Sequence, residues 1–326
     1  MNRRNFVQNA VLCTTGLMTF AEEMVWGQTS LTEVGKRVGI IGLDTSHSEV
    51  FTKIINANHP EMKGYKVVAA YPHGSKDIAS ALKIKDGITR AVQNQGVEIV
   101  NSIEELLTKV DVVLLESNDG RSHLEQALPV LKAGKRMFID KPVAANLQGA
   151  LAIFSAAQQA NTPIFSSSAL RFDASVQKVV AGSIGKITGV DVYTPAKMDK
   201  THSDLAWYAI HGVEMLFTVM GTGCRHVSRT YQEGTDVVVG VWDDGRIGTL
   251  RGIRAGAANI AGTAFGEKGI APLGPFASYE PLVGEIISFF DTGKPPVSST
   301  QTLEIFRFIQ AADRSKKKGG KAVSLI

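Results

Sequence analysis

The stretch that decides the fold is Arg37-Val-Gly-Ile-Ile-Gly-Leu43, which is followed directly by Asp44-Thr-Ser-His47. A short run that is apolar throughout is typical of a strand buried on both faces of a sheet. Residues 48–56 then repeat apolar side chains at helical spacing. A buried strand that leads through a tight turn into a helix is the basic unit of a parallel sheet, so we predict an α/β fold.

The alternation of strands and helices continues to about residue 170. Gly134 is placed to end a helix over 122–133, and Ser102 with Glu105 forms a capping box that starts another helix. This pattern predicts a Rossmann-like, doubly wound parallel sheet over residues 36–170. The other predicted elements are strands over 65–71, 97–100, 111–115, 136–140 and 163–167, and a helix over 146–160.

Beyond residue 170 the pattern changes to long strand-like segments with few helices between them. We predict a second, α+β domain over residues 171–326, built on a mostly antiparallel sheet. Its predicted strands are 187–194, 236–242 and 246–251, its predicted C-terminal helices are 279–290 and 301–316, and Trp242, Phe289 and Phe290 are expected in the core.

The composition excludes several classes of protein. Of the 326 residues, 44% are hydrophobic and 20% charged, which excludes a disordered or collagen-like chain. The mean hydropathy of +0.03 is too low for a protein with several membrane spans. The net charge is 35 − 31 = +4, and the basic run over 314–321 has no interleaved aromatic residues, so we expect a solvated helix end and no nucleic-acid partner. Cys13 and Cys224 are too few for a disulfide framework.

The N-terminus resembles a targeting signal. Arg3 and Arg4 precede Phe6 and a moderately apolar stretch over 10–20, which is too short for a stable membrane span. Paired arginines in this setting resemble a twin-arginine export signal, so we predict a signal segment over 1–30 and a periplasmic protein. The alternative is an ordinary basic N-terminus on a cytoplasmic protein.

The turn after the first strand is a candidate cofactor site, because ligands of open α/β sheets bind beyond the carboxyl ends of the strands. Of the dinucleotide fingerprint Gly-x-Gly-x-x-Gly, only the first glycine, Gly42, is present; Asp44 and His47 occupy the other two positions. A carboxylate at the second position would repel phosphates, whereas Thr45 and Ser46 offer hydroxyls beside a helix N-terminus. The alternative is a capped turn without a ligand.

The ends of two further strands add cofactor candidates. No acidic residue that would bind a ribose 2′-hydroxyl follows the second strand before Asp77, whereas Ser75 and Lys76 could meet a 2′-phosphate and so favour NADP. The alternative there is a plain turn. Ser117 and Asn118, which follow the strand over 111–115, are also expected to contact the cofactor.

The strongest catalytic candidate is Lys141, in the sequence Asp140-Lys-Pro142 at the end of a predicted strand. The proline restricts Lys141 to an extended backbone and stops the strand, which would fix the direction of the ammonium group. Lys141 could therefore orient a substrate hydroxyl or accept its proton. The alternative is a surface lysine at a turn.

A second catalytic candidate is His211, within a predicted helix over 207–216. Helical spacing would place Trp207, His211 and Glu214 on one face, with His211 as a general base oriented by Glu214 or by a backbone group. The alternative is a buried histidine with a structural hydrogen bond. Arg171 is a candidate substrate contact, and a salt bridge is its alternative role.

Together these stretches resemble the glucose–fructose oxidoreductase / inositol dehydrogenase (Gfo/Idh/MocA) family. The family's Glu-Lys-Pro is Asp-Lys-Pro here, which keeps Lys141, and its histidine matches His211, whereas the acid four residues before that histidine is replaced by Trp207. The matching segments are Val38–Leu43, His123–Pro142, Leu170–Phe172, Ile184–Ile187, the helix around His211 and the C-terminal residues 320–325.

The resemblance implies a Rossmann domain followed by an open-faced sheet domain, NAD or NADP as cofactor, a sugar or polyol substrate and a homo-oligomer formed through the sheet. We therefore expect hydride transfer between a hydroxyl-bearing carbon and the nicotinamide. The alternatives are a redox-neutral, glycoside-cleaving enzyme with tightly bound NAD, or a non-catalytic binding relative. No metal is expected, because Asp44, His47 and Glu49 do not have the spacing of a strong site.

Overall fold

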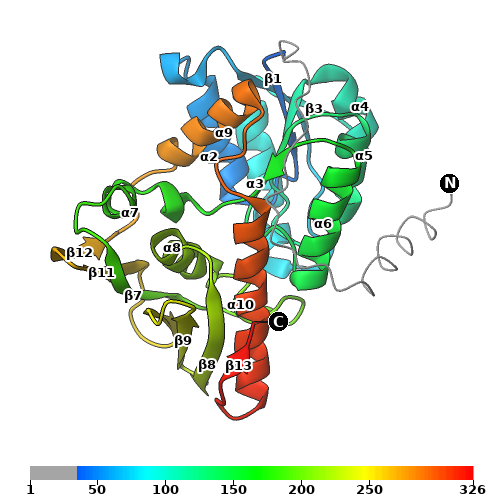
Figure 1. Cartoon of the computed structure of the whole chain (residues 1–326). Helices are drawn as coiled ribbons and strands as arrows, with labels where there is room; N and C mark the ends of the chain where they lie inside the picture. The colour runs from blue at the N-terminus through cyan, green and yellow to red at the C-terminus, as the bar shows by residue number, and fades with distance from the viewer. Residues whose placement is uncertain (1–34, 326) are drawn as a thin grey trace.

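The computed structural model describes residues 35–325, which form two sheets with helices packed against them (Figure 1). The first sheet has the strand order β3-β2-β1-β4-β5-β6, and all of its pairings are parallel, which confirms the predicted doubly wound sheet. Its strands are β1 (Arg37–Ile41), β2 (Lys66–Tyr71), β3 (Glu98–Ile99), β4 (Val112–Leu115), β5 (Met137–Ile139) and β6 (Ile164–Phe165).

Helices cover both faces of the first sheet, which is why β4 is buried along its whole length. One face carries α2 (Ser46–Asn56) and α3 (Ala79–Gln93), and the other carries α4 (Ile103–Lys109), α5 (His123–Lys132) and α6 (Leu147–Gln159). Side-chain caps fix where these helices begin: the Thr45 hydroxyl accepts a hydrogen bond from the amide of His47, and Ser102 accepts one from Glu105.

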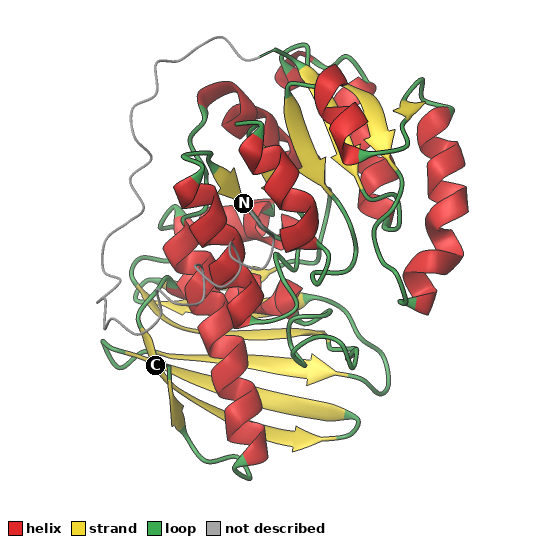
Figure 2. Cartoon of the chain, turned by 90° about the vertical axis from the view of Figure 1, so that its right-hand side faces the viewer, coloured by secondary structure: helices red, strands yellow, loops and turns green. Residues whose placement is uncertain are grey.

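The second sheet has the order β12-β11-β7-β10-β9-β8-β13, and only the β7–β10 pairing is parallel. The predicted mostly antiparallel sheet is therefore confirmed. Figure 2 shows the long helix α10 lying across this sheet. The elements are β7 (Ile187–Pro195), β8 (Cys224–Gln232), β9 (Thr235–Trp242), β10 (Ile247–Ile253), β11 (Ala261–Gly266), β12 (Gly269–Leu273), β13 (Val323–Ser324), α7 (Ala174–Val180), α8 (Ile210–Met220) and α10 (Ser299–Lys317).

The last part of the chain links the two sheets. Helix α9 (Glu280–Thr292) returns to the first sheet, where Leu282, Phe289 and Phe290 pack in the same core cluster as β1 and α2. Trp242 is 2% exposed in the core of the second sheet, as predicted. The last part of the chain therefore packs in the cores of both sheets.

Some predicted boundaries were wrong. The helix predicted from residue 207 begins at Ile210, so Trp207 does not share a helix face with His211; its ring packs against His202, with 4.8 Å between the centroids. The predicted signal segment over 1–30 lies outside the described residues. Among the residues that the structure describes, no helix is long and apolar enough to cross a membrane.

Candidate active site

The site is built at the carboxyl ends of β1, β4 and β5, where the strand order reverses and ligands of such sheets bind. Gly42 ends β1 with a φ of +90°, and a Cβ atom there would lie 2.5 Å from the amide nitrogen of Ser117. Only glycine tolerates both conditions. The first glycine of the fingerprint is therefore required by the turn itself.

Asp44, at the position of the second glycine, is fully buried and bridges two loops. Its carboxylate accepts hydrogen bonds from the amide of Ser75, at 2.6 Å, and from the amide of Asn118, at 3.0 Å. These amides belong to the loops after β2 and β4. The carboxylate thus links the two loops through two backbone donors, a pairing that the sequence could not show.

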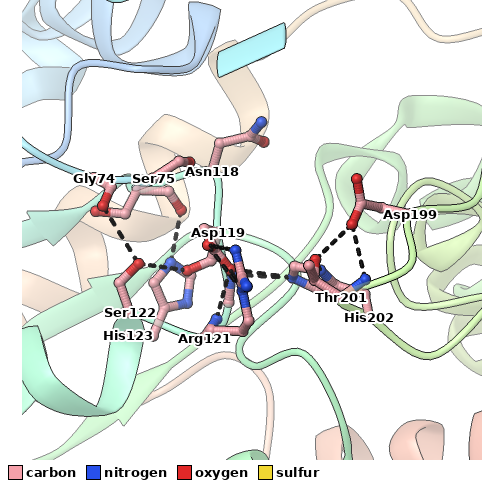
Figure 3. A network of polar contacts seen from close by, with 12 residues as sticks. Gly74, Ser75, Asn118, Asp119, Arg121, Ser122, His123, Asp199, Thr201 and His202 are labelled. Carbon is pink, nitrogen blue, oxygen red and sulfur yellow. Dashed lines mark hydrogen bonds and ion pairs between the residues drawn. The ribbon is translucent and has the colours of Figure 1, made fainter. Parts of the chain in front are cut away.

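A network of polar contacts joins the same two loops (Figure 3). Arg121 forms ion pairs with Asp119 and Asp77, and these hydrogen bonds raise the pKa of the guanidinium and lower the pKa of Asp77. The Ser122 hydroxyl donates to the carbonyl of Gly74. Because Asp77 follows β2 and Arg121 follows β4, these ion pairs tie the two loops together.

A loop of the second domain supports this network. His202 is 8% exposed, and its Nε2 accepts a hydrogen bond from the amide of Gly120 at 3.2 Å. Figure 3 shows His202 with Thr201 and Asp199 facing the loop that carries Asp119. The two domains therefore meet beside the candidate cofactor site.

Lys141 lies directly after β5 with its side chain 11% exposed, so it is not the solvated surface lysine that was the alternative. Its Nζ is 3.4 Å from Oδ2 of Asp140. The same oxygen lies 2.8 Å from Nδ1 of His47, and Nε2 of His47 lies 3.1 Å from the hydroxyl of Tyr279 on the loop before α9. Burial works to raise the pKa of Asp140, but the charges of His47 and Lys141 outweigh it and hold this pKa below its usual range.

His211 lies on α8, close enough to Lys141 for the charge of that lysine to act on its pKa. Its Nδ1 lies 2.7 Å from the hydroxyl of Ser168, which leaves Nε2 for a substrate. Burial, followed by the charges of Lys141 and His47, lowers the pKa of His211 well below its usual range, so the ring is neutral at neutral pH. Ser168, rather than Glu214, therefore orients His211, and the predicted His211–Glu214 pair was wrong.

Glu214 instead pairs with Arg171, and both side chains are buried. Oε2 of Glu214 accepts hydrogen bonds from Nη2 of Arg171 at 2.6 Å and from Nε at 3.1 Å, and Gln301 accepts from Nη1 at 2.9 Å. Each of the three guanidinium nitrogens thus has an acceptor, and Nε also donates to the Ser167 hydroxyl. Arg171 therefore has the structural role that the sequence left as its alternative, and the assignment of Arg171 to substrate binding is withdrawn.

Glu116, which follows β4, is a site residue that the sequence analysis did not identify. It is fully buried, and neither carboxylate oxygen has a hydrogen-bond partner among the described residues. Burial and the neighbouring Asp140 raise its pKa well above the usual value. A glutamate at the end of an apolar strand gives no sequence signal, because burial on all sides depends on elements far along the chain.

The residues of the site can be compared with what the predicted dinucleotide needs for binding. Gly42 makes the tight turn, Ser46 lies exposed at the N-terminus of α2, and the Ser75 hydroxyl is buried without a partner among the described residues. These features fit a phosphate and a ribose, provided that Asp44 releases the amides of the two loops. Lys141 follows β5 at the same edge of the sheet.

Three of the residues predicted to contact the cofactor also have structural partners. The Ser117 hydroxyl donates to Oε1 of Gln126 at 2.6 Å, and the carbonyl of Ser117 lies 2.7 Å from Nε2 of His123. Lys76 is exposed, and its Nζ lies 3.5 Å from a carboxylate oxygen of Glu125. Thr45 caps α2 rather than facing solvent. The contacts of all these residues with a cofactor stay predictions.

Comparison with known proteins supports the fold and the family. Residues 36–168 match the model of the oxidoreductase family with an NAD-binding Rossmann fold (GFO_IDH_MocA). No curated protein matches the chain.

Solved structures resemble the chain over most of its length. A putative myo-inositol dehydrogenase from Sinorhizobium meliloti is similar with a TM-score of 0.73 and 17% identity, over 90% of this chain and 100% of that one. A myo-inositol 2-dehydrogenase from Lactobacillus plantarum has a TM-score of 0.72 and 18% identity, over 90% and 99%. A scyllo-inositol dehydrogenase from Lactobacillus casei, solved with NAD(H) and scyllo-inositol, has a TM-score of 0.67 and 18% identity, over 90% and 99%. At these identities the likeness shows a shared fold.

Proposed function

Because residues 36–168 match the model of the oxidoreductase family with an NAD-binding Rossmann fold, we propose that the chain is an NAD(P)-dependent oxidoreductase acting on a sugar or polyol. The observation that carries this proposal is the placement of Lys141. Its ammonium group is nearly buried at the carboxyl end of β5, and the neutral imidazole of His211 faces the same cleft from the second domain.

The residues of the cleft suit proton handling at a substrate hydroxyl. Bound there, NAD(P) supplies the acceptor for the hydride that leaves the hydroxyl-bearing carbon. Lys141 donates a hydrogen bond to the hydroxyl oxygen and so orients the carbon. Nε2 of His211 accepts the hydroxyl proton, since Nδ1 is bonded to Ser168. Because its pKa is lowered, His211 is already deprotonated at neutral pH and ready to act as the base.

The test is NADH or NADPH formation, followed at 340 nm, with a panel of inositols, free sugars and sugar acids. We expect turnover with at least one polyol or sugar, and a fall in kcat of at least 100-fold in Lys141→Met, with dinucleotide affinity within a few-fold of wild type. Unchanged turnover in Lys141→Met would remove the catalytic assignment. Running NAD and NADP in parallel decides between them; the prediction that Ser75 and Lys76 meet a 2′-phosphate favours NADP.

The contacts of Asp44 support a second candidate, a relative that has lost the chemistry. Its carboxylate already holds the amides of Ser75 and Asn118. No binding of either dinucleotide by the folded protein would favour this candidate. Glycoside cleavage without net cofactor reduction would instead favour the redox-neutral enzyme.

Export and assembly are further proposals. The paired arginines at residues 3 and 4 support export by a twin-arginine route, with a cytoplasmic protein as the alternative. A homo-oligomer through the second sheet is supported by exposed apolar side chains on its strands, with Tyr193 41%, Ile247 50% and Ile270 69% exposed. Cell fractionation tests the first proposal, and light scattering after size exclusion tests the second.

A further inference from the structure

Three buried side chains converge beneath the candidate active site, from three different elements. They are His47 in the first turn of α2, Glu116 after β4 and Asp140 after β5. One nitrogen or oxygen atom from each lies within 4.8 Å of the others. His47 is 6% exposed, Asp140 1% and Glu116 0%, so bulk water does not solvate the cluster.

The carboxylates of this cluster lack the partners that burial demands. Both oxygens of Glu116 and Oδ1 of Asp140 have no hydrogen-bond partner among the described residues. Leaving a buried polar group unsatisfied costs about 1–3 kcal/mol, and more for a charged group. Among the described residues, Lys141 is the lysine whose charge acts on both carboxylates, with its Nζ 3.4 Å from Asp140, so one of the two negative charges is not balanced when His47 is neutral. The cluster therefore calls for another cation, either a proton or a metal ion.

We propose that His47, Glu116 and Asp140 bind a divalent transition-metal ion, Zn²⁺ or Mn²⁺. One imidazole and two carboxylates are the nitrogen and oxygen donors that such ions prefer. Two atoms bound to one ion at about 2.1 Å are separated by about 3 Å, and Nδ1 of His47 already lies 2.8 Å from Oδ2 of Asp140. The ion takes the place of the proton that these atoms share in the metal-free protein.

The surroundings of His47 orient its ring for this role. Nε2 lies 3.1 Å from the hydroxyl of Tyr279, so a proton on Nε2 is hydrogen-bonded and Nδ1 is left to face the carboxylates. Burial, followed by the charge of Asp140, raises the pKa of Tyr279 to about 12, which keeps its hydroxyl neutral. Phe51 stacks on the imidazole with 5.3 Å between the ring centroids. Such outer contacts fix the tautomer of a histidine ligand.

The site goes beyond the proposed hydride transfer and does not depend on it. Three protein ligands leave coordination positions free for water or a hydroxyl oxygen, as in catalytic rather than purely structural metal sites. These positions would lie beside Lys141, where the proposed substrate hydroxyl binds. No local spacing marks this site, because the three proposed ligands are spread over 94 positions, from 47 to 140.

The experiment is calorimetric titration of chelator-treated protein with ZnCl₂ and, separately, with MnCl₂, without dinucleotide or substrate. We expect one ion per chain for at least one of the two metals, and affinity at least 100-fold weaker in Glu116→Gln and His47→Ala. Glu49→Gln is the matched control, because Glu49 lies on α2 two residues from His47 and outside the cluster. It is expected to bind within threefold of wild type.

A second measurement keeps the test decisive where a variant fails to fold. Co²⁺ added to the wild-type protein is expected to give visible absorption bands of a bound ion with a nitrogen ligand, and excess Zn²⁺ is expected to remove them. No saturable binding of any of the three ions, or equal affinity in folded Glu116→Gln, would overturn the proposal and leave a proton as the cation of the cluster. Because no dinucleotide is present, this outcome is independent of whether NAD(P) binds.

Discussion

Replacing Asp44 by alanine tests whether this carboxylate occupies backbone amides that a dinucleotide phosphate would otherwise use. The substitution leaves the buried amides of Ser75 and Asn118 without their acceptor. At about 1–3 kcal/mol for each unsatisfied donor, the free energy of unfolding should fall by about 2–6 kcal/mol. The same two donors become available to a phosphate, so NAD⁺ should stabilise the variant more than the wild type.

The assay is urea unfolding of both proteins, without NAD⁺ and at a series of NAD⁺ concentrations. A ligand at 100 times its Kd adds about 2.7 kcal/mol, so a tenfold gain in affinity is visible as about 1.4 kcal/mol of additional stabilisation. Asp86→Ala is the matched control, because Asp86 is exposed on α3 and its loss should change stability by less than about 0.5 kcal/mol. An Asp44→Ala protein as stable as the wild type, with the same response to NAD⁺, would refute the reasoning.

Two further predictions concern buried charges in the second domain. Glu214→Ala leaves the buried guanidinium of Arg171 without its partner, so urea unfolding should show a loss of about 3–5 kcal/mol. Burial, followed by the charge of Asp204, raises the pKa of Asp313 to about 6 from a usual value of 3.8. Between pH 3.8 and about 6, Asp313 is protonated in the folded state and ionised in the unfolded state. The free energy of unfolding of the wild type should therefore fall as the pH rises from about 4 to about 6, by at most about 3 kcal/mol. Asp313→Asn, measured by unfolding across this range, should show a flatter profile.

Each of these two predictions has its own control. Asp291→Ala removes an exposed partner of Lys63, and it should cost no more than about 1 kcal/mol. A loss of the same size in Glu214→Ala would contradict the buried-pair argument. Equal pH profiles for wild type and Asp313→Asn would contradict the assignment of this pH dependence to Asp313.

The first sheet was predictable because its strands are short apolar runs, and burial on both faces leaves no other pattern. Helix α3 was not predicted, because polar and apolar residues alternate irregularly on its exposed face. Only Ala81, Ile88 and Val92 are buried among its 15 residues. Strand β8 escaped for a different reason. An arginine at position 229 suggests a side chain that faces solvent. In the structure Arg229 faces inward, is 1% exposed and pairs with Asp236.

Residues of the candidate site were predictable only where the neighbouring sequence marks a single residue. Lys141 is marked by the proline after it, and Gly42 by the turn after β1. Pairings between distant residues were not predictable: Ser168 meets His211 across 43 positions, and Glu116 has no local pattern at all. The role of Asp44 was open for the same reason, since its two partners come from loops 31 and 74 positions away.

The proposed function depends on a dinucleotide that binds across the carboxyl ends of the first sheet with its reactive ring at Lys141. Calorimetric titration of NADH and NADPH into the folded protein tests it most directly. We expect saturable binding of NADH or NADPH, with one molecule per chain and tighter binding in Asp44→Ala. Absence of binding by both wild type and Asp44→Ala, with each protein shown to be folded, would contradict it.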